Sequence, residues 1–509
     1  MNGLSGYHTW LAQGYGKEES LYRCLRQKII EGKLKQGDTL PSTREAAREL
    51  ALSRGTVITA YDRLRAEGLA QAQQGGYTTV AYSFEAEPVG EQTEPIPKLS
   101  PFGDRIRQLA EQEAAASSLS PSSCDLLDLS PHAYTGLEVS VHTWQRCLRE
   151  AVREFDWQQS DNDHSNNRAA SLEEAIELHL IRHRGIQTKR SHIRVTRGSQ
   201  EAILLLVQAL VRTGDHVLIE TPGYPGIRHI VEAAGGIPEY CQVQDGSSLQ
   251  EQLERSRARL MILTPNRQFP TGATMEWEQR SQVLRWAEQN DAFIIEDDFD
   301  SDFGLGGKRY ELLQSMDRSE RVLYVGSFSR TIHPKLRLGY MVLPSRLIPI
   351  MDAMLRVYQR YEIVSIEQRA LALFILSGSY ERHLRRVSRL IKQRAALYSR
   401  QLAEAVGSLL EWDTDHIGLH LYATWTGSIA SYESYRERAL SYGVCWKEGK
   451  GYDLGSEYGH PPPVSRPSVL FGIARLDEEQ WKLGCDRLRM AAAHFEDHRA
   501  VRDETSCYP

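Results

Sequence analysis

Neither a long apolar run nor a targeting signal is found in this 509-residue sequence. The densest apolar stretch, Ala202 to Val211, is interrupted by Gln208 and is about half as long as a membrane-spanning helix requires. The N-terminus lacks the basic segment and apolar core of a secretion signal. Membrane insertion and export are therefore not expected, and the sequence predicts a cytoplasmic protein.

Paired cysteines and an excess of positive charge are also lacking. The seven cysteines lie far apart, in odd number, and none forms a Cys-x-x-Cys pair, so a disulfide framework and a zinc knuckle are unsupported. The net charge of −6 does not suggest nucleic acid as a partner. Residues 17–82 nevertheless hold 11 Lys or Arg and 8 Asp or Glu, and this local charge of +3 permits DNA binding.

The composition is that of a folded protein, with 41% hydrophobic and 25% charged residues. At about 100 to 200 residues per domain, the length predicts two to four domains. Between Glu85 and Ser123 the sequence is rich in Pro, Glu, Gln, Ser and Ala, which is typical of a linker, with a short helix from Arg105 to Ala116. We predict an N-terminal domain over residues 1–82, a linker over 83–124 and a larger domain over 125–498.

The first 80 residues have the pattern of three helices followed by a β-hairpin. Apolar residues three and four apart predict a helix over Glu18–Glu31. Two shorter helices are predicted over Pro41–Leu50 and Arg54–Glu67, with only a tight turn between them. The segment Leu69–Val80, around a Gly-Gly pair, predicts the hairpin. This order is that of a helix-turn-helix followed by a wing.

Small polar residues mark the starts of the two shorter helices. Ser42 and Glu45 have the spacing of a capping box, and Ser53 is a natural N-cap. We expect the following residues of the last helix in the core: Ile58, Tyr61 and Leu64. The start of that helix instead offers polar side chains and free backbone N–H groups, which can meet bases and phosphates in a major groove.

The string LPSTREAARELALSRGTVITAYDRLRAEGL closely resembles the winged helix-turn-helix of GntR-type regulators. The resemblance covers residues 17–82. It implies that the following residues contact DNA: Arg44, Ser53, Arg54, Thr56 and Gly75. The alternative is a small helical module for protein contacts, since the helix-turn-helix also serves as a scaffold.

In the larger domain, short β-branched segments alternate with amphipathic ones, which indicates an α/β fold with a mostly parallel sheet covered on both faces. The predicted strands are His216–Glu220, Arg259–Leu263, Phe293–Glu296, Val322–Gly326 and Gly339–Leu343. Helices are predicted between them, for example over Ser199–Arg212 and Met275–Asn290. After Arg346 the pattern is mostly helical to Glu404 and then mixed, which predicts a smaller α/β subdomain.

Three strings carry most of the chemical information: ILTPNRQFPTG, FIIEDDFDSDF and YVGSFSRTIHPKLRLGYMVLP. Each begins on a strand and ends in a loop, so their polar ends should meet at one edge of the sheet, where ligands bind in open α/β folds. Together with TRGSQEAI and TPGYPG they resemble fold-type I aminotransferases, which use pyridoxal phosphate, and this likeness covers residues 125–498. A GntR-like domain joined to such a body resembles the MocR-type transcriptional regulators, which implies a homodimer.

The resemblance implies an intact site for the phosphate of the coenzyme. Ser327, Ser329 and Arg337 match the family's phosphate ligands. Ser199 and Gln200, after Gly198, open a helix whose N-terminus can receive an anion.

The positions around the ring and the substrate are less complete. Asp297 matches the acid behind the pyridine nitrogen, and Tyr224 matches the aromatic residue that stacks on the ring. Phe299 replaces the tyrosine that bonds the ring oxygen, a loss of about 1 kcal/mol. Leu470 replaces the arginine that holds a substrate carboxylate, for which Arg475 is a partial substitute.

The family's Schiff-base lysine is replaced by arginine, because this chain has S-F-S-R where the family has S-F-S-K. Arg330 stays protonated to about pH 12 and is no nucleophile, so an internal aldimine at this position is excluded. Either Arg330 is a fixed charge that holds the carboxylate or free aldehyde of a ligand, or it pairs with Asp297 or Asp300 and only stabilises the fold. Transamination is therefore not expected.

Another lysine is the remaining route to an active enzyme. Lys335, five residues beyond Arg330, follows Pro334 in a loop from which its amine could reach inward, and Lys308 is a more distant substitute. The alternative to a regulator is thus an aminotransferase that uses Lys335. Solvated surface lysines are the simpler interpretation of both residues.

Metal sites are not expected. His179 and His183 have the spacing of a metal pair on a helix, but neither the Glu of His-Glu-x-x-His nor a third ligand is evident. A solvated helix face is the expected environment of both. The acidic run Glu296–Asp302 points in alternating directions after its strand, so it does not predict a cation site.

Taken together, these patterns predict a transcriptional regulator that binds operator DNA through residues 17–82. Its degenerate aminotransferase-like domain is expected to dimerise and to sense pyridoxal phosphate, or a related anionic compound, without a covalent bond. A third hypothesis is an architectural DNA-binding protein whose body binds no ligand.

Overall fold

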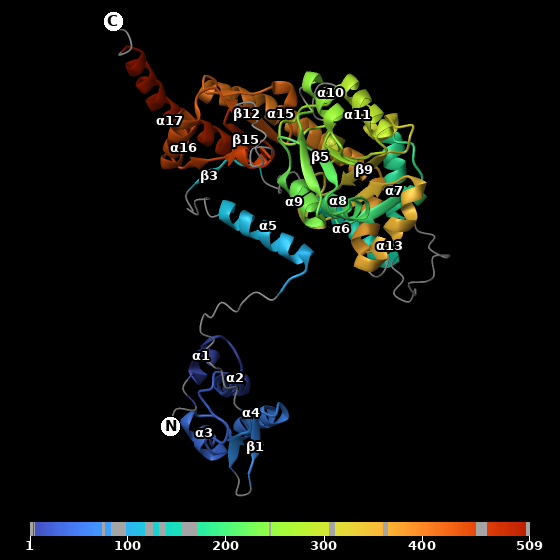
Figure 1. The fold of residues 1–509 in the computed structure, drawn as a ribbon. Helices are drawn as coiled ribbons and strands as arrows, with labels where there is room; N and C mark the ends of the chain where they lie inside the picture. Colours follow the sequence, from blue (N-terminus) through green and yellow to red (C-terminus); the bar gives the residue numbers. More distant parts are fainter. Residues whose placement is uncertain are drawn as a thin grey trace. The chain divides into compact units, whose positions relative to one another are not determined.

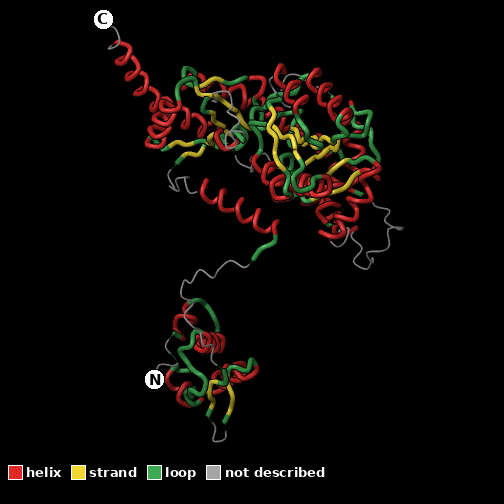
Figure 2. The backbone as a smooth tube through the Cα atoms, in the orientation of Figure 1, coloured by secondary structure: helices red, strands yellow, loops and turns green. Residues whose placement is uncertain are grey.

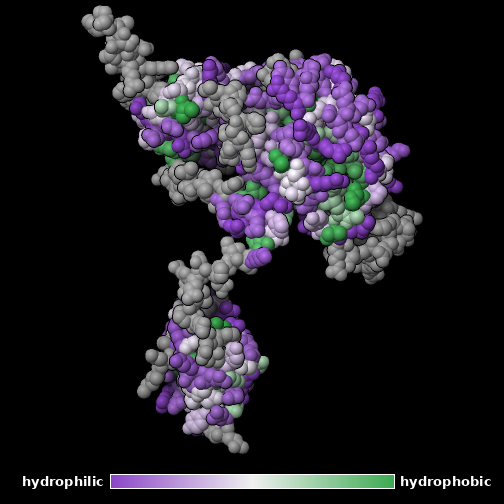
Figure 3. Space-filling view, in the orientation of Figure 1, coloured by the Kyte–Doolittle hydropathy of each residue, from purple (hydrophilic) through white to green (hydrophobic). Residues whose placement is uncertain are grey.

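The computed structural model forms two compact units, Met1–Lys98 and Leu99–Pro509, which are treated separately below. The structure describes residues 4, 6–73, 77–82, 98–117, 126–131, 139–154, 171–243, 246–304, 311–359, 365–454 and 466–504. Hydrophilic residues cover most of the visible face of each unit, with scattered hydrophobic side chains between them (Figure 3). Within the described ranges, no helix has the length and apolar character to span a bilayer.

The N-terminal unit is a small helical domain with a two-stranded hairpin (Figure 1). Its elements are α1 (Tyr7–Ala12), α2 (Lys17–Ile30), α3 (Thr43–Glu49), α4 (Arg54–Ala66), β1 (Ala70–Ala72) and β2 (Thr78–Val80). The strands β1 and β2 pair antiparallel, with Ala70 opposite Val80. The three predicted helices and the hairpin are confirmed, whereas α1, which adds Tyr7 to the core, was not predicted.

Local hydrogen bonds explain where α3 and α4 begin. Ser42 Oγ accepts from the N–H of Glu45 at 3.2 Å, and Glu45 Oε2 accepts from the N–H of Ser42 at 2.9 Å, which confirms the capping box. Ser53 Oγ accepts from the N–H of Thr56 at 3.1 Å, so Ser53 caps α4.

The prediction that Ile58 of α4 lies in the core is wrong. Tyr61 and Leu64 are buried as expected, but Ile58 is 38% exposed. The buried face of α4 follows residues 57, 60, 61 and 64, which are spaced three and four apart. Ile58 is one residue out of this frame, so Val57 takes its place in the core.

The larger unit is built on a seven-stranded sheet with the strand order β4-β10-β9-β8-β7-β5-β6 (Figures 1 and 2). The strands are β4 (Ile193–Thr196), β5 (His216–Glu220), β6 (Ile237–Cys241), β7 (Leu260–Leu263), β8 (Phe293–Asp298), β9 (Val322–Ser327) and β10 (Gly339–Val342). The sheet is mostly parallel, as predicted, but β10 runs antiparallel to both of its neighbours.

Helices cover both faces of this sheet (Figure 2). In β8, Ile295 packs into one core with residues of α8 and α9, and Ile294 packs into another core with residues of α11. The helices of the unit are α5 (Pro101–Ser117), α6 (Val141–Glu154), α7 (Leu172–His179), α8 (Ser199–Leu210), α9 (Pro225–Ala234), α10 (Gly246–Arg255), α11 (Trp277–Gln289), α12 (Leu313–Met316), α13 (Ile348–Gln359), α14 (Ile366–Leu376), α15 (Ser379–Val406), α16 (Ile429–Ser441) and α17 (Glu478–Glu504). Residues on both faces of β7, β8, β9 and β10 are therefore buried, which agrees with the predicted sheet covered on both faces.

A smaller subdomain follows α15. Its four-stranded antiparallel sheet has the order β11-β12-β15-β14, formed by β11 (Leu410–Glu411), β12 (His420–Trp425), β15 (Ser468–Gly472) and β14 (Lys447–Glu448). A parallel pair joins β13 (Val444–Cys445) to β3 (Leu127–Asp128). Helix α15 contributes to two cores, with Tyr380 in that of the large sheet and Leu402 in that of the subdomain.

Candidate ligand-binding site and DNA interface

The ends of four strands of the large sheet meet at one edge. Asp297 in β8 lies opposite Val325 in β9, two residues before Ser327 at the end of that strand. Ser327 lies opposite Gly339, the first residue of β10, and Gly339 also lies opposite Thr196 at the end of β4. Because β10 is antiparallel, the residues just before it lie at this same edge. The structure thus brings the predicted phosphate and ring positions together.

The N-terminus of α8 adjoins the loop after β9. A Cβ atom on Gly198, whose φ is 91°, would lie 3.9 Å from Ser329 Oγ, and a Cβ on Gly339 would lie only 2.7 Å from the carbonyl carbon of Gly198. The two glycines therefore allow the loops to approach. The N–H of Ser329 donates to Ser327 Oγ at 3.2 Å. Hydroxyls beside the free N–H groups of a helix N-terminus form a place for an anion.

Two other predicted phosphate ligands, Gln200 and Arg337, are exposed. Arg337 has a φ of 46°, which is uncommon for a residue with a side chain. It lies two residues before β10, and therefore at the edge where Ser327 ends β9. Exposure keeps both side chains available to a ligand, and their role as phosphate ligands stays a prediction.

Asp297 is a buried carboxyl in need of a hydrogen-bond donor. It is 8% exposed, and within the described part of the chain its Oδ1 atom has no hydrogen-bond partner. Burial, with Asp298 and Glu220 nearby, raises the pKa of Asp297 to about 7. An unpaired buried acid is costly. The N–H of a protonated pyridine ring would supply the missing partner, so this residue fits the coenzyme.

A second buried carboxyl, which the sequence analysis missed, lies near Asp297. Glu220 ends β5 and accepts a hydrogen bond from the N–H of Thr264 at 2.9 Å. Burial raises the pKa of Glu220 to about 7, against the effect of the hydrogen bonds from Thr264. The sequence does contain a signal for Glu220, because it is an acidic residue at the end of an apolar strand.

Aromatic side chains gather around Phe269. Its ring lies 6.1 Å from Tyr224, 5.9 Å from Phe299, 5.5 Å from His420 and 5.2 Å from Tyr452, measured between centroids. Tyr224 is 45% exposed, as a side chain that stacks on a ligand requires. His420 and Tyr452 come from the smaller subdomain, far along the sequence, where no local pattern marked them.

The positive charge of Arg330 acts on two members of this aromatic group, His420 and Tyr452. Burial lowers the pKa of His420 to about 3, and the charges of Arg267 and Arg330 lower it further. His420 is therefore neutral, and its Nε2–H donates to the carbonyl of Pro270 at 2.7 Å. Burial raises the pKa of Tyr452, whereas Arg330 opposes that shift. Arg330 itself is half-buried.

Asp300, one of the two acids considered as partners for Arg330, is paired with another arginine. Arg267 Nε lies 3.3 Å from Asp300 Oδ2, and both side chains are almost fully buried. Burial raises the pKa of Asp300 to about 6, against the charges of Arg267 and Arg330. In the ranges that the structure covers, Arg330 forms no ion pair with Asp297 or Asp300. Its guanidinium therefore remains available to a ligand.

The suggested substitutes for the missing lysine and arginine, Lys335 and Arg475, are both exposed. Lys335 is exposed in a short 3-10 turn, where its N–H donates to His333 Nδ1 at 3.0 Å. Leu470 is fully buried in β15, and Arg475 donates to the carbonyl of Asp128 at 3.1 Å. Gly75 and Lys308, singled out from the sequence, lie outside the described residues.

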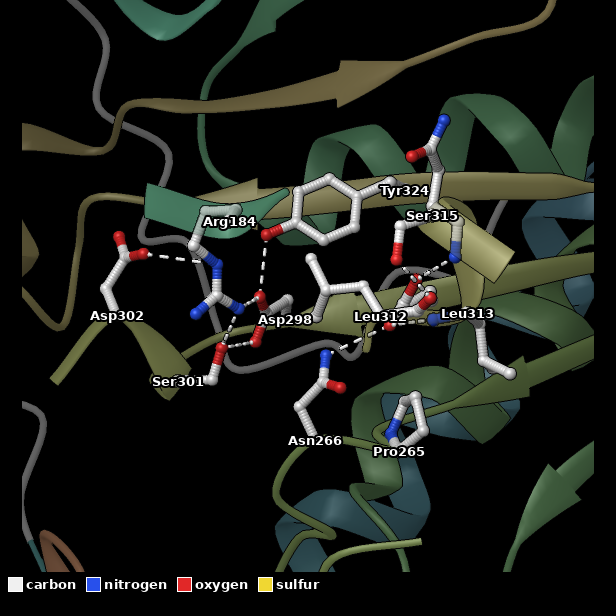
Figure 4. A network of polar contacts seen from close by, with 12 residues as sticks. Arg184, Pro265, Asn266, Asp298, Ser301, Asp302, Leu312, Leu313, Ser315 and Tyr324 are labelled. Carbon is white, nitrogen blue, oxygen red and sulfur yellow. Dashed lines mark hydrogen bonds and ion pairs between the residues drawn. The ribbon is translucent and has the colours of Figure 1, made fainter. Parts of the chain in front are cut away.

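Behind the site, the acids that follow Asp297 are held by a buried arginine. Arg184 contacts Asp298, Ser301 and Asp302, and the hydroxyl of Tyr324 donates to Asp298 Oδ2 at 2.6 Å (Figure 4). Asp298 and Asp302 thus lie on two sides of one guanidinium (Figure 4). Two acids of the run thus contact the same positive charge, that of Arg184.

In the N-terminal unit, the predicted DNA-contacting residues lie at the starts of α3 and α4. Arg44, Ser53 and Arg54 are exposed, and Thr56 is half-buried with its Oγ1 2.8 Å from Ser53 Oγ. Arg54 Nε donates to Thr43 Oγ1 at 3.3 Å, which ties the starts of the two helices together. The exposed Ile58, one turn after Arg54, lies on the same face of α4.

Comparisons with known proteins cover both units. Residues 17–80 match the model of bacterial regulatory proteins of the gntR family, and residues 125–428 match that of aminotransferase class I and II. The probable rhizopine catabolism regulatory protein MocR of Rhizobium meliloti is 31% identical, over 94% of each chain. The pyridoxine biosynthesis transcriptional regulator PdxR of Corynebacterium glutamicum is 30% identical, over 75% of this chain and 77% of its own.

Solved structures agree with this fold. A kynurenine aminotransferase of Pyrococcus horikoshii matches with a TM-score of 0.64 and 20% identity, over 78% of this chain and 95% of its own. The α-aminoadipate aminotransferase LysN of Thermus thermophilus matches with a TM-score of 0.63 and 20% identity, over 78% of this chain and 98% of its own. At this identity the likeness concerns the fold alone.

Proposed function

Because this chain belongs to the MocR-type transcriptional regulators, which join a GntR helix-turn-helix to an aminotransferase-like domain, we propose that it binds operator DNA through α4 and senses pyridoxal phosphate or a related anion. One observation carries the ligand part of the proposal. The unpartnered Asp297 and the loops that carry Ser327 and Ser329 lie at one sheet edge, beside an arginine in place of the lysine.

Each residue has a definite part in holding the ligand. Ser327, Ser329 and the N-terminus of α8 bind the phosphate, to which Arg337 adds a positive charge. Asp297 accepts the hydrogen bond from the ring nitrogen, which removes the penalty of its unpaired burial. Arg330 holds the free aldehyde or a carboxylate by hydrogen bonds. When bound, pyridoxal phosphate supplies an aldehyde that amines can capture.

Bound ligand acts on DNA affinity by favouring one arrangement of the protein over another. The resulting change in DNA affinity is limited by the difference between the ligand's affinities for the two arrangements. The resemblance to this family implies a homodimer, which would place two copies of the helix-turn-helix on two half-sites of the operator. A homodimer is therefore part of the proposal.

Wild-type protein mixed with pyridoxal phosphate is expected to bind it without a covalent bond. Titration calorimetry should show saturable binding, and borohydride treatment should leave the mass of the chain unchanged, because Arg330 cannot attack an aldehyde. Lys335→Gln serves as the control and should bind equally well. A mass increase that borohydride fixes to Lys335 would support the aminotransferase alternative. The absence of any heat of binding would support the hypothesis that the larger domain binds no ligand.

Arg54→Ala is expected to weaken binding to an operator duplex selected from random-sequence DNA by about 1–3 kcal/mol, because an exposed arginine at the start of α4 is lost. Electrophoretic mobility shifts with the full chain measure the change. Arg65→Ala is the matched control, since Arg65 lies in the last turn of α4 and pairs with Asp62. Equal affinities of the two variants would remove the start of α4 from the interface.

A further inference from the structure

His179 does not lie on a solvated helix face, contrary to the sequence-based expectation. It is the last residue of α7 and is only 3% exposed, because α7 packs against α14. The chain then continues as a π-helix over Leu180–Arg184, which carries His183. The imidazole centroids of His179 and His183 lie 5.4 Å apart. Single π-turns of this kind are frequent at functional sites.

A third side chain, distant in sequence, faces both histidines. Glu381 lies in the first turn of α15, and its Oε1 is 3.9 Å from His179 Nδ1 and 3.6 Å from His183 Nε2. These distances are beyond good hydrogen bonds. One ligand atom from each of the three residues lies within 4.8 Å of the others. These three metal-ligating atoms therefore form no hydrogen bonds with one another, and the space between them is called the gap below.

Two atoms of these residues lack partners. In the part of the chain that the structure covers, His179 Nδ1 and Glu381 Oε2 are buried and accept no hydrogen bond. The other nitrogen of His179, Nε2, lies 3.3 Å from Asp302 Oδ1, and Asp302 also accepts from the hydroxyl of Tyr380 at 2.7 Å. A carboxylate behind a histidine fixes its tautomer and leaves the opposite nitrogen to bind a metal ion.

The charges around the gap call for a cation. Two carboxyls, those of Asp298 and Asp302, contact one guanidinium, that of Arg184, and the carboxyl of Glu381 faces the two histidines instead, which leaves an excess of negative charge.

We propose that His179, His183 and Glu381 bind a divalent cation of the Zn²⁺ class, with water at the fourth position. Two imidazoles and one carboxylate are a known ligand set for zinc with an open position. Ligand atoms about 2.0–2.2 Å from one ion lie up to about 4 Å apart, so the distances to Glu381 fit. The side chain of His183 is 43% exposed, so its ring can turn inward and solvent can reach the ion.

Zinc titration of the full, chelator-treated chain tests this site. Wild type should bind one equivalent of Zn²⁺ tightly, and His183→Ala and Glu381→Gln should each weaken that binding by about tenfold to a hundredfold or more. His142→Ala, which removes an exposed histidine from α6, is the matched control and should bind like wild type.

Two further measurements separate a bound ion from a structural ion pair. Zn²⁺ should raise the melting temperature of wild type and of His142→Ala but not that of His183→Ala, and bound Co²⁺ should give a visible absorption band only in the first two. Unchanged zinc affinity in both ligand variants, or no tight binding by wild type, would overturn the proposal. Because His183 is exposed, its loss should leave the fold intact, which far-UV circular dichroism checks.

Discussion

Arg330→Lys is expected to make pyridoxal phosphate binding covalent. A lysine amine can lose its proton and attack the aldehyde, which the guanidinium cannot do. Partial burial of this position favours the neutral amine. After incubation with the coenzyme and borohydride, the mass of Arg330→Lys should rise by one coenzyme, whereas the mass of wild type should not change.

Arg337→Lys is the matched control for this experiment. It also replaces an arginine with lysine at the same sheet edge, but on the proposed phosphate side, away from the aldehyde. Its mass should remain unchanged. If Arg330→Lys binds the coenzyme and still gains no mass, position 330 does not face the aldehyde, and the proposed orientation of the ligand is wrong.

Asp297→Asn is expected to stabilise the ligand-free chain at high pH and to weaken ligand binding. Burial, with the acids around it, raises the pKa of Asp297 from 3.8 to about 7 in the folded protein. Between these values the unfolded chain has released a proton that the folded chain retains, so stability falls as pH rises and is lowest above about pH 7. Asparagine avoids this loss, which is of the order of a few kcal/mol.

The difference between Asp297→Asn and wild type should therefore be large at pH 8 and smaller at pH 5, as measured by thermal or urea unfolding without ligand. Affinity for pyridoxal phosphate should change in the opposite sense and fall about tenfold or more, because a charge-assisted hydrogen bond is lost. Asp291→Asn, at an exposed site beside Arg321, is the control and should show neither effect. Lower stability of Asp297→Asn at pH 8 would contradict the account.

Local patterns were sufficient where local forces decide the structure. Ser42, Glu45 and Ser53 marked the starts of α3 and α4 because their hydrogen bonds span only three residues. The strand β5 matches its prediction at both ends, since an apolar run between polar residues defines it. The meeting of Asp297 and Ser327 at one edge was also predictable, because both follow apolar strands of one sheet.

Contacts between distant segments were not predictable in this way. The direction of β10, which brings Arg337 to the ligand edge, depends on its pairing with β4 and β9. Glu381 lies about 200 residues after His179, and nothing in the local sequence of either residue indicates the other. Ile58 was misplaced because its apolar character was given more weight than the helical frame in which Val57 is buried.

Helix α15 is packed into the core of the large sheet near one end and into the core of the smaller subdomain near the other, which has a mechanical consequence. Its 28 residues span about 40 Å, and near one end the hydroxyl oxygen of Tyr380 lies 3.0 Å from Thr331 Oγ1, next to Arg330. Near the other end, Leu402 is packed in the core of the smaller subdomain. A continuous helix is stiff over this length, so it acts as a lever. A small tilt of α15 at Tyr380 would therefore displace Leu402 sideways by a larger distance.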